Sequence, residues 1–309
     1  MRVLRNIFEY NNTQPTVLTI GAFDGVHLGH QKILTGLKRC AVEKKIATVV
    51  LSFFPHPRKV VQNNLNMGLL NSISEKEKLI ERQGIDFLII HPFDEYFAQI
   101  TPEDFVKEVL VKTLNVQKII IGYDHRFGKD RAAGIQELRF FGQKYGFEVE
   151  EIGVKEVDTV SVSSTKIRKA LQEGNIKEAN QFLGYAYGFD AQVVRGNQLG
   201  RTIGFPTANL EPLDKDKIIP FTGVYIVKVL LRGEVYKGMM NIGNRPTIEG
   251  DKLTYEVHIL DFEEDIYDCE VRVEFEQRIR NEQKFESLDH LKLQLHQDLE
   301  QTKAYTIYV

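Results

Sequence analysis

Apolar residues are spaced in two different ways along the 309-residue chain. Before about residue 184, short apolar runs such as Val17 to Ile20 and Ala47 to Phe54 alternate with segments whose apolar residues recur every three or four positions. The runs are typical of strands buried on both faces of a parallel sheet, and the segments between them are typical of amphipathic helices. We therefore expect an α/β domain over residues 1–184, with βαβ units and right-handed crossovers.

Local signals mark where these elements begin. The expected strands cover residues 17–20, 47–54, 86–91, 117–122 and 147–152. The expected helices begin at Gln31, at a capping box of Ser74 and Glu77, at Thr101 before a proline, and near Ile135. Strand and helix thus alternate throughout the first part of the chain.

After about Gly184 the pattern changes, and strand-like segments follow one another. Strands are expected near residues 190–195, 223–231, 234–242, 253–260 and 269–278. In the last of these, Val271, Val273 and Phe275 alternate with charged residues, as in an antiparallel strand with one buried face. Ser287 is expected to cap a final helix. The apolar stripe of that helix consists of Leu288, Leu291, Leu295 and Leu299. Residues 185–309 therefore predict a small antiparallel β-barrel with a closing C-terminal helix.

Composition narrows the class of protein without changing this architecture. A net charge of −3 and the lack of a long basic block give no electrostatic case for a nucleic-acid partner. Cys40 and Cys269 are the only cysteines and form no C-x-x-C pair, which favours a reducing compartment over a disulfide framework or a thiolate zinc site. The amino terminus lacks a signal-peptide core, and no apolar run approaches the roughly 18 residues of a membrane span. We expect a soluble, cytoplasmic protein with no membrane partner.

The densest chemistry of the first part lies between its first buried strand and the next helix. Residues 19–30, TIGAFDGVHLGH, hold three glycines, Asp24 and the histidines His27 and His30. Glycines let the backbone approach a phosphate, helix amides bind phosphate oxygens, and histidines three residues apart can project toward one point. Their imidazoles suit the charge that builds on phosphorus during transfer. The alternative is a glycine-rich turn with two surface histidines.

A second cluster, SVSSTKIR, covers residues 161–168. Its hydroxyls are expected to cap a helix, and Lys166 and Arg168 offer cations to a leaving pyrophosphate. An ordinary cap followed by a basic helix face is the alternative.

Four motifs of the first part resemble, in order and spacing, the adenylyltransferase module of bacterial bifunctional riboflavin kinase/FAD synthetases. They are Gly21-x-Phe23-Asp24-Gly25-x-His27-x-Gly29-His30, Phe54-x-His56-Pro57, Gly122-Tyr123-Asp124-His125-Arg126-Phe127-Gly128 and Ser163-Ser164-Thr165-x-Ile167-Arg168. The resemblance implies a Rossmann-like nucleotidylyltransferase fold in which His27, His30 and Arg168 are catalytic. The implied ATP site consists of Gly21, Phe23, Asp24, Gly25, His27, His30, Asp124, Ser164, Thr165 and Arg168. The resemblance also implies flavin packing by Phe54 and Phe127, and His125 stands where many relatives have Phe.

The second part has its own glycine-rich stretch, residues 196–209. It is not a Walker A loop, because no G-K-[S/T] follows the glycines. Loop amides around Gly196, Gly200 and Gly204 can still wrap a phosphate. Thr207 and Asn209 lie two residues apart, so on a strand they face the same side, and their hydroxyl and amide oxygens suit Mg²⁺. A plain turn is the alternative.

Glu256 and His258 share one face of a predicted strand. A carboxylate there can act as general base toward a hydroxyl. A solvated strand face is the alternative for both side chains, and His258 is expected to have a structural role.

These second-part motifs resemble the riboflavin kinase module of the same family, a small antiparallel barrel. They are Gly200-Arg201-x-x-Gly204-Phe205-Pro206-Thr207-Ala208-Asn209, Gly223-Val224-Tyr225, Asn241-Ile242-Gly243-x-Arg245-Pro246-Thr247, Glu256-x-His258 and Arg280-Asn281-Glu282-x-Lys284-Phe285. The resemblance implies Mg²⁺ on Thr207 and Asn209, and Glu256 as base for the ribityl 5′-hydroxyl. The implied kinase ATP site consists of Gly196, Gly200, Arg201, Gly204, Thr207 and Asn209. A loop closing over flavin would begin at Arg280 and Glu282, for which a surface salt-bridge segment is the alternative.

Together the motifs predict a bifunctional enzyme of flavin cofactor biosynthesis. Residues 185–309 would phosphorylate riboflavin with ATP and Mg²⁺, giving FMN and ADP, and residues 1–184 would join FMN to a second ATP, giving FAD and pyrophosphate. Two rival hypotheses stay open. A cytidylyltransferase would keep H-x-G-H but has no reason to carry G-F-P-T-A-N. A nucleic-acid-binding barrel would need a basic groove with stacking aromatics, against which the acidic run Glu263-Glu264-Asp265 argues.

Overall fold

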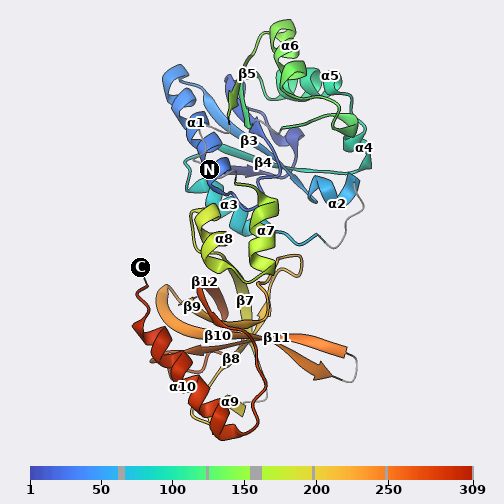
Figure 1. Cartoon of the computed structure of the whole chain (residues 1–309). Helices are drawn as coiled ribbons and strands as arrows, with labels where there is room; N and C mark the ends of the chain where they lie inside the picture. The colour runs from blue at the N-terminus through green and yellow to red at the C-terminus, as the bar shows by residue number, and fades with distance from the viewer. Residues whose placement is uncertain (62–66, 123–124, 154–161, 197–198, 248–249, 308–309) are drawn as a thin grey trace. The chain divides into compact units, whose positions relative to one another are not determined.

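The computed structural model describes residues 1–61, 67–122, 125–153, 162–196, 199–247 and 250–307. The chain divides into two compact units, Met1–Ser164 and Thr165–Val309 (Figure 1). The first is an α/β unit and the second a β-barrel with a C-terminal helix, so the predicted fold class is confirmed. The predicted domain boundary at residues 184/185 lies later in the chain than this division and stays a prediction.

The first unit is built on one parallel sheet with the strand order β1-β4-β3-β2-β5-β6. Its strands are β1 Arg2–Leu4, β2 Thr16–Ile20, β3 Ala47–Phe54, β4 Phe87–Pro92, β5 Val116–Gly122 and β6 Glu148–Ile152. From β2 the chain continues to β3 on one side and later to β5 on the other. The direction of winding therefore reverses between β2 and β5, and ligands of α/β proteins bind at the carboxyl ends of strands at such a point.

Neighbouring residues along each strand point to opposite faces of the sheet and belong to two separate hydrophobic cores. Val17 and Val50 pack with Leu34 and Leu37 of α1 on one face of the sheet. The residues that alternate with these valines along the same strands belong to a second core. That core also contains the buried sides of the helix after residue 104 and of α6. Strands with two covered faces must be apolar throughout, which explains the unbroken apolar runs in the sequence.

The predicted helices of this unit are present in the predicted order, together with short ones that the sequence analysis did not predict. They are η1 Ile7–Glu9, α1 Leu28–Lys44, α2 Pro57–Val61, α3 Ile73–Glu81, α4 Glu95–Ala98, α5 Pro102–Asp104, the π-helix η2 Phe105–Thr113, η3 Lys129–Arg131 and α6 Ile135–Tyr145. Two expected starts were wrong. Helix α1 begins at Leu28 instead of Gln31, because His27 acts as its N-cap, and the capping box of α3 is Ser72 with Glu75, two residues before the expected pair.

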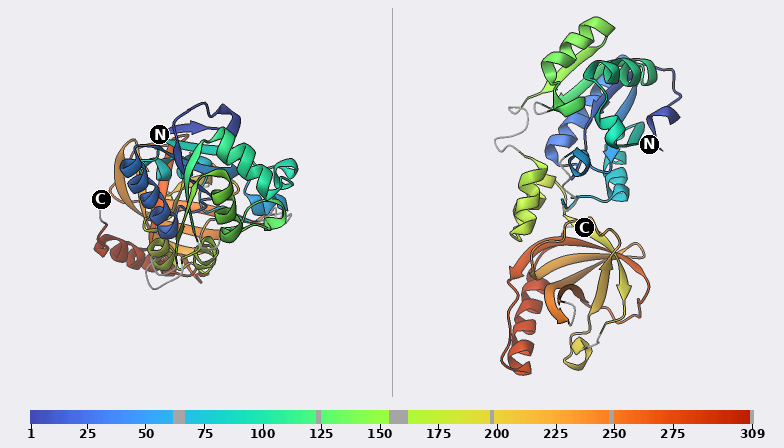
Figure 2. Two further views of the ribbon diagram at one scale, coloured as in Figure 1. Left: turned by 90° about the horizontal axis from the view of Figure 1, so that it is seen from above. Right: turned by 90° about the vertical axis from the view of Figure 1, so that its right-hand side faces the viewer.

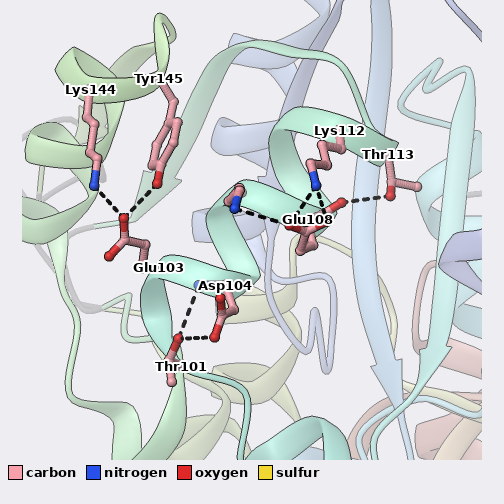
Figure 3. A network of polar contacts seen from close by, with 9 residues as sticks. Thr101, Glu103, Asp104, Glu108, Lys112, Thr113, Lys144 and Tyr145 are labelled. Atoms are coloured by element: carbon pink, nitrogen blue, oxygen red, sulfur yellow. Dashed lines mark hydrogen bonds and ion pairs between the residues drawn. The ribbon is translucent and has the colours of Figure 1, made fainter.

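A surface network joins the segment after β4 to α6 (Figure 3). One carboxylate oxygen of Glu103 accepts from Lys144 Nζ at 2.5 Å and from Tyr145 OH at 2.6 Å. Thr101 caps α5 by accepting from the Asp104 amide, as its sequence predicts. These contacts join α5 to α6 at the surface of the unit.

The second unit is a closed barrel with the strand order β10-β11-β8-β7-β12-β9, all pairs antiparallel. Its strands are β7 Gly188–Val194, β8 Ala208–Pro212, β9 Gly223–Leu231, β10 Glu234–Thr247, β11 Gly250–Ile259 and β12 Glu270–Arg280. Figure 2 shows these strands curving around a common centre, with the long C-terminal helix on the outside. Val271, Val273 and Phe275 point to the buried interior, which confirms the alternation in their sequence. Closure leaves no open sheet edge.

Four helices complete this unit: α7 Ser164–Gln172, α8 Ile176–Leu183, α9 Leu199–Thr202 and α10 Leu288–Ala304. Helix α8 is tied to the barrel, because Asn180 Nδ2 donates to the Phe275 carbonyl at 2.9 Å. Ser287 caps α10 as expected, but the predicted leucine stripe is only partly correct. Leu288 is 65% exposed, and the fully buried residues of α10 are the polar Asp298 and Thr302, which the apolar pattern does not reveal.

In the part of the chain that the structure describes, no helix combines the length and the apolarity needed to cross a membrane. Both cysteines are free thiols, as their spacing predicts.

Candidate active sites

The first site is the turn between β2 and α1, at the point where the winding of the sheet reverses. His27 is the N-cap of α1, and its Nδ1 accepts from the His30 amide at 3.4 Å. A ring nitrogen that accepts an N–H carries no proton, so the proton of neutral His27 lies on Nε2, which is free to donate. The His27 ring thus lies at the N-terminus of α1, the end of a helix that binds phosphate in many proteins.

The two histidines form one stacked pair. Their ring centroids are 3.7 Å apart with an angle of 16° between the planes, and the Phe23 ring lies 4.8 Å from His30. Burial lowers the pKa of His27 to about 4, and burial, then His27, then Lys76 hold the pKa of His30 well below its usual value. Both imidazoles are therefore neutral near pH 7, and they can meet an anion as hydrogen-bond donors without carrying a full charge.

The backbone of this turn is held in an uncommon conformation. Phe23, Gly25 and Val26 have φ angles of 49°, 88° and 33°. Glycine adopts such angles freely, but a β-branched valine does not, and each such non-glycine residue costs about 1–3 kcal/mol. Strain of this kind persists only where surrounding contacts determine the conformation, so the contacts of the turn are part of the site.

Asp24 supplies several of those contacts. Its carboxylate is 3% exposed and accepts from the amides of Leu70 at 2.9 Å and Asn71 at 3.3 Å. Its carbonyl accepts from Ser164 Oγ at 2.9 Å, so Ser164, the last residue of the first unit, contacts the turn. Asp24 thus faces the protein, whereas the sequence placed it among the ATP contacts.

The other predicted residues of the first site are distributed as follows. Thr165 and Arg168 lie on α7, in the second compact unit. Asp124 lies outside the described residues. Phe54, at the end of β3, is 44% exposed, whereas Phe127 is 7% exposed and packs against Phe105 and His125.

The second site lies where β8 and β11 pair in the barrel. Asn209 is directly opposite Glu256 in the register, and Thr207 Oγ1 donates to Glu256 Oε2 at 3.3 Å. Directly opposite residues of antiparallel strands project to the same face. The structure therefore brings a hydroxyl, an amide and a carboxylate from two distant segments to one place.

The glycine loop passes against these side chains. A Cβ atom on Gly196 would stand 2.1 Å from Asn209 Nδ2, and one on Gly200 would stand 2.2 Å from the Phe205 carbonyl oxygen. Gly204 has a φ of 87°, which glycine adopts without strain. A side chain at Gly200 would collide with backbone, one at Gly196 would displace Asn209, and one at Gly204 would strain the backbone, while Arg201 between them is exposed. His258 fixes the end of the loop, because its Nδ1 lies 2.8 Å from the Pro206 carbonyl oxygen.

Arg280 and Glu282 are held by contacts within the second unit. Arg280 makes a bidentate ion pair with Asp298 of α10, with N–O distances of 2.8 to 3.1 Å. Glu282 accepts from the Asn244 amide at 3.2 Å. The Arg280 pair is not a loose surface salt bridge, since Asp298 is fully buried, whereas Glu282 is exposed.

The sequence interpretation missed Lys76 and Ser52, which contact the turn from α3 and β3. Lys76 lies three residues after Ile73 and four before Ile80, so it occupies the apolar face of α3. A lysine at a core position of a helical pattern is the signal that could have found it.

Comparison with known proteins identifies both parts of the chain. Residues 9–166 match the FAD synthetase family, and residues 183–306 match the riboflavin kinase family. The chain is 40% identical to a bifunctional riboflavin kinase/FMN adenylyltransferase of Haemophilus influenzae, over 99% of both chains. It is 38% identical to the protein of that name from Escherichia coli, over 96% of both. A solved structure from Streptococcus pneumoniae, described as a macrolide-efflux protein, has 32% identity and a TM-score of 0.91 over 99% of both chains.

The chain belongs to the family of bifunctional riboflavin kinase/FMN adenylyltransferases. Its FAD synthetase activity lies in the amino-terminal part and its riboflavin kinase activity in the carboxyl-terminal part, as predicted.

Proposed function

We propose that the turn from Gly21 to His30 performs adenylyl transfer and that the β8–β11 pair performs phosphorylation of riboflavin. The observation that carries the proposal is the convergence of separate motifs in each unit. The stacked His27–His30 pair lies on a helix N-terminus, and Thr207 contacts Glu256 across 49 positions of sequence.

At the first site a phosphate oxygen of FMN attacks the α-phosphorus of ATP. The new P–O bond forms as the bond between the α-phosphorus and the oxygen bridging to the β-phosphorus breaks, and pyrophosphate leaves. The neutral imidazoles of His27 and His30 and the first amides of α1 donate to the phosphates as charge develops. The backbone at Gly21, Phe23 and Gly25 supports this surface, and Asp24 fixes it.

Further residues of the first site are assigned from the family motif. Ser164, Thr165 and Arg168 serve the triphosphate, with Arg168 stabilising the leaving pyrophosphate. Asp124 contributes a polar contact to ATP. Phe54 packs on the flavin ring through its exposed face, and Phe127 supports that side from the core.

At the second site Glu256 accepts the proton of the ribityl 5′-hydroxyl while that oxygen attacks the γ-phosphorus of ATP. The bond from the γ-phosphorus to the oxygen bridging to the β-phosphorus breaks, and ADP leaves. Thr207 Oγ1 and the amide oxygen of Asn209 are hard donors that fit Mg²⁺, which needs few protein ligands when phosphate and water complete its shell. When bound, Mg²⁺ neutralises phosphate charge.

The remaining kinase residues surround these three. Gly196, Gly200, Arg201 and Gly204 wrap the ATP phosphates through the loop backbone and one cation. Arg280 and Glu282, anchored to Asp298 and Asn244, form the base of a segment that covers flavin. A cytoplasmic location, where riboflavin and ATP are both supplied, completes the proposal.

One assay tests both halves. The purified chain is incubated with riboflavin, ATP and Mg²⁺, and the flavins are separated by chromatography. We expect FMN first and FAD later, with no FMN after EDTA is added in excess. Absence of both products would overturn the proposal. Turnover of a cytidine nucleotide with another phosphorylated substrate, or salt-sensitive RNA binding without flavin turnover, would support the rivals.

A further inference from the structure

A buried lysine is fastened to the phosphate-binding turn. Lys76 of α3 is 5% exposed, and its Nζ donates to the Ala22 carbonyl at 2.8 Å. Ser52 Oγ, at 3.4 Å from Nζ, donates to the same carbonyl at 3.1 Å. Ala22 lies between Gly21 and the positive-φ residue Phe23. A cation and a hydroxyl thus hold one peptide group of the turn, from two other elements of the fold.

The turn and the α3 segment each hold the other through hydrogen bonds. The Asp24 carboxylate of the turn accepts from the Leu70 and Asn71 amides, which directly precede α3. Ser72 and Glu75 then fix the first turn of α3 through reciprocal capping bonds of 3.2 and 2.9 Å. Lys76 is the residue directly after Glu75. Its ammonium is therefore positioned against the Ala22 carbonyl by a segment that is itself bonded to the turn.

The charge of Lys76 also reaches the histidine pair. Burial lowers the pKa of Lys76, and the Asp24 carboxylate opposes that change. Lys76 in turn contributes to the low pKa of His30, after burial and His27. A cation within an enclosed site acts on nearby charge more strongly than it would in water. It therefore favours the anionic phosphates that meet the turn.

We propose that Lys76 is a positioning residue of the adenylyl-transfer reaction, holding the Ala22 peptide so that His27 and His30 face the reacting phosphate. The inference rests on the proposed role of the turn. Without this bond the turn has one fewer contact to hold Phe23 and Val26 at positive φ, and the Phe23 ring that packs on His30 would shift with it. Displacing a catalytic group by about 1 Å can lower a rate roughly 100-fold.

The test compares K76M with K78M in the full chain. Lys78 is on the same helix but exposed, so K78M is a matched control. The readouts are kcat and KM for FAD formation from FMN and ATP, FMN formation from riboflavin, and the thermal unfolding midpoint. We expect K76M to lower kcat for FAD formation about 100-fold with a smaller change in KM. FMN formation by K76M, and both activities of K78M, should stay within twofold of the wild type.

K76R separates positioning from packing, because it restores a cation and an N–H donor while Met supplies only the apolar stem. The kcat of K76R for FAD formation should be at least tenfold higher than that of K76M. FAD formation by folded K76M within threefold of the wild type would overturn the inference, as would K76R no better than K76M. If K76M does not fold, S52A decides: it should lower kcat about fivefold, and an unchanged rate overturns the inference.

Failure of the proposed function would look different. In that case H30A would form FAD at the wild-type rate. A defective H30A beside a fully active K76M would contradict the Lys76 inference alone.

Discussion

The two candidate sites of this chain both suit ATP phosphates, but they are built from different parts of the polypeptide. In the first unit a strained backbone turn carries the site, and buried groups such as Asp24 and Lys76 bind that backbone. In the barrel, side chains carry the site: Thr207, Asn209 and Glu256 are aligned by strand register.

This difference explains how each site is kept in shape. Barrel register is set by many ladder bonds, so single side chains can be exchanged without moving their neighbours. The turn has no ladder around it and depends on a few long-range contacts to buried groups. We expect changes at the barrel site to remove one chemical function, and changes around the turn to act through geometry.

The largest expected effect is at Glu256. E256Q keeps the size of the side chain and an acceptor for Thr207 but cannot take a proton. It should lower kcat for riboflavin phosphorylation about 1,000-fold, the middle of the range for general-base catalysis. FAD formation from supplied FMN should be unchanged. The control is E211Q, an exposed carboxylate on β8. Equal loss of both activities in folded E256Q would contradict the separation of the sites.

The reciprocal change is H30A. It removes one imidazole of the stacked pair and should lower kcat for FAD formation about 100-fold, as for loss of one transition-state donor. Both activities are measured in one preparation, so FMN formation from riboflavin is the internal control. A parallel fall in FMN formation would mean that the two sites do not work separately.

A third change tests how α10 is held on the barrel. D298N removes the charge that pairs with Arg280 and leaves a largely buried guanidinium without its counter-ion. Breaking such a pair destabilises by about 3 kcal/mol, measured as a lower free energy of unfolding in urea. E300Q on the same helix breaks only an exposed pair with Lys303 and should change it by less than about 1 kcal/mol. Equal effects of the two variants would show that burial of Asp298 does not matter.

The smallest effect concerns pH. Burial lowers the pKa of His125 to about 4, whereas in an unfolded chain it is about 6.5. Between these values the unfolded chain binds a proton that the folded chain does not. The stability contributed by neutral His125 is therefore complete above pH 6.5 and is lost as pH falls toward 4.

H125F removes this proton linkage. The loss of unfolding free energy between pH 7.5 and 5.0 should shrink by about 2 kcal/mol in H125F, followed by circular dichroism in urea. H290F, at an exposed histidine of α10, is the control. An unchanged pH dependence in H125F would show that His125 is not enclosed as the structure places it.

The fold was largely predictable because each of its signals is local. Apolar runs predicted β3 and β9 to the residue, and period-two alternation predicted the buried side of β12. The errors occurred where another residue competes for the same role. The capping box of α3 is formed by Ser72 and not by Ser74. His27 is the N-cap of α1, a position that histidine seldom occupies and that the sequence pattern did not indicate.

From the sequence alone, the fold classes of the two units and most of their strands could be predicted, because periodicity and motif spacing are properties of neighbouring residues. The short strands β1 and β8 carry too few residues for such a pattern. Only the tertiary structure decided that Glu256 meets Thr207, that Asp298 neutralises Arg280, and that Lys76 holds the Ala22 carbonyl. These pairs come from different elements, and their contact depends on strand register and helix packing. Those are set by the free energy of the whole unit and not by any one segment.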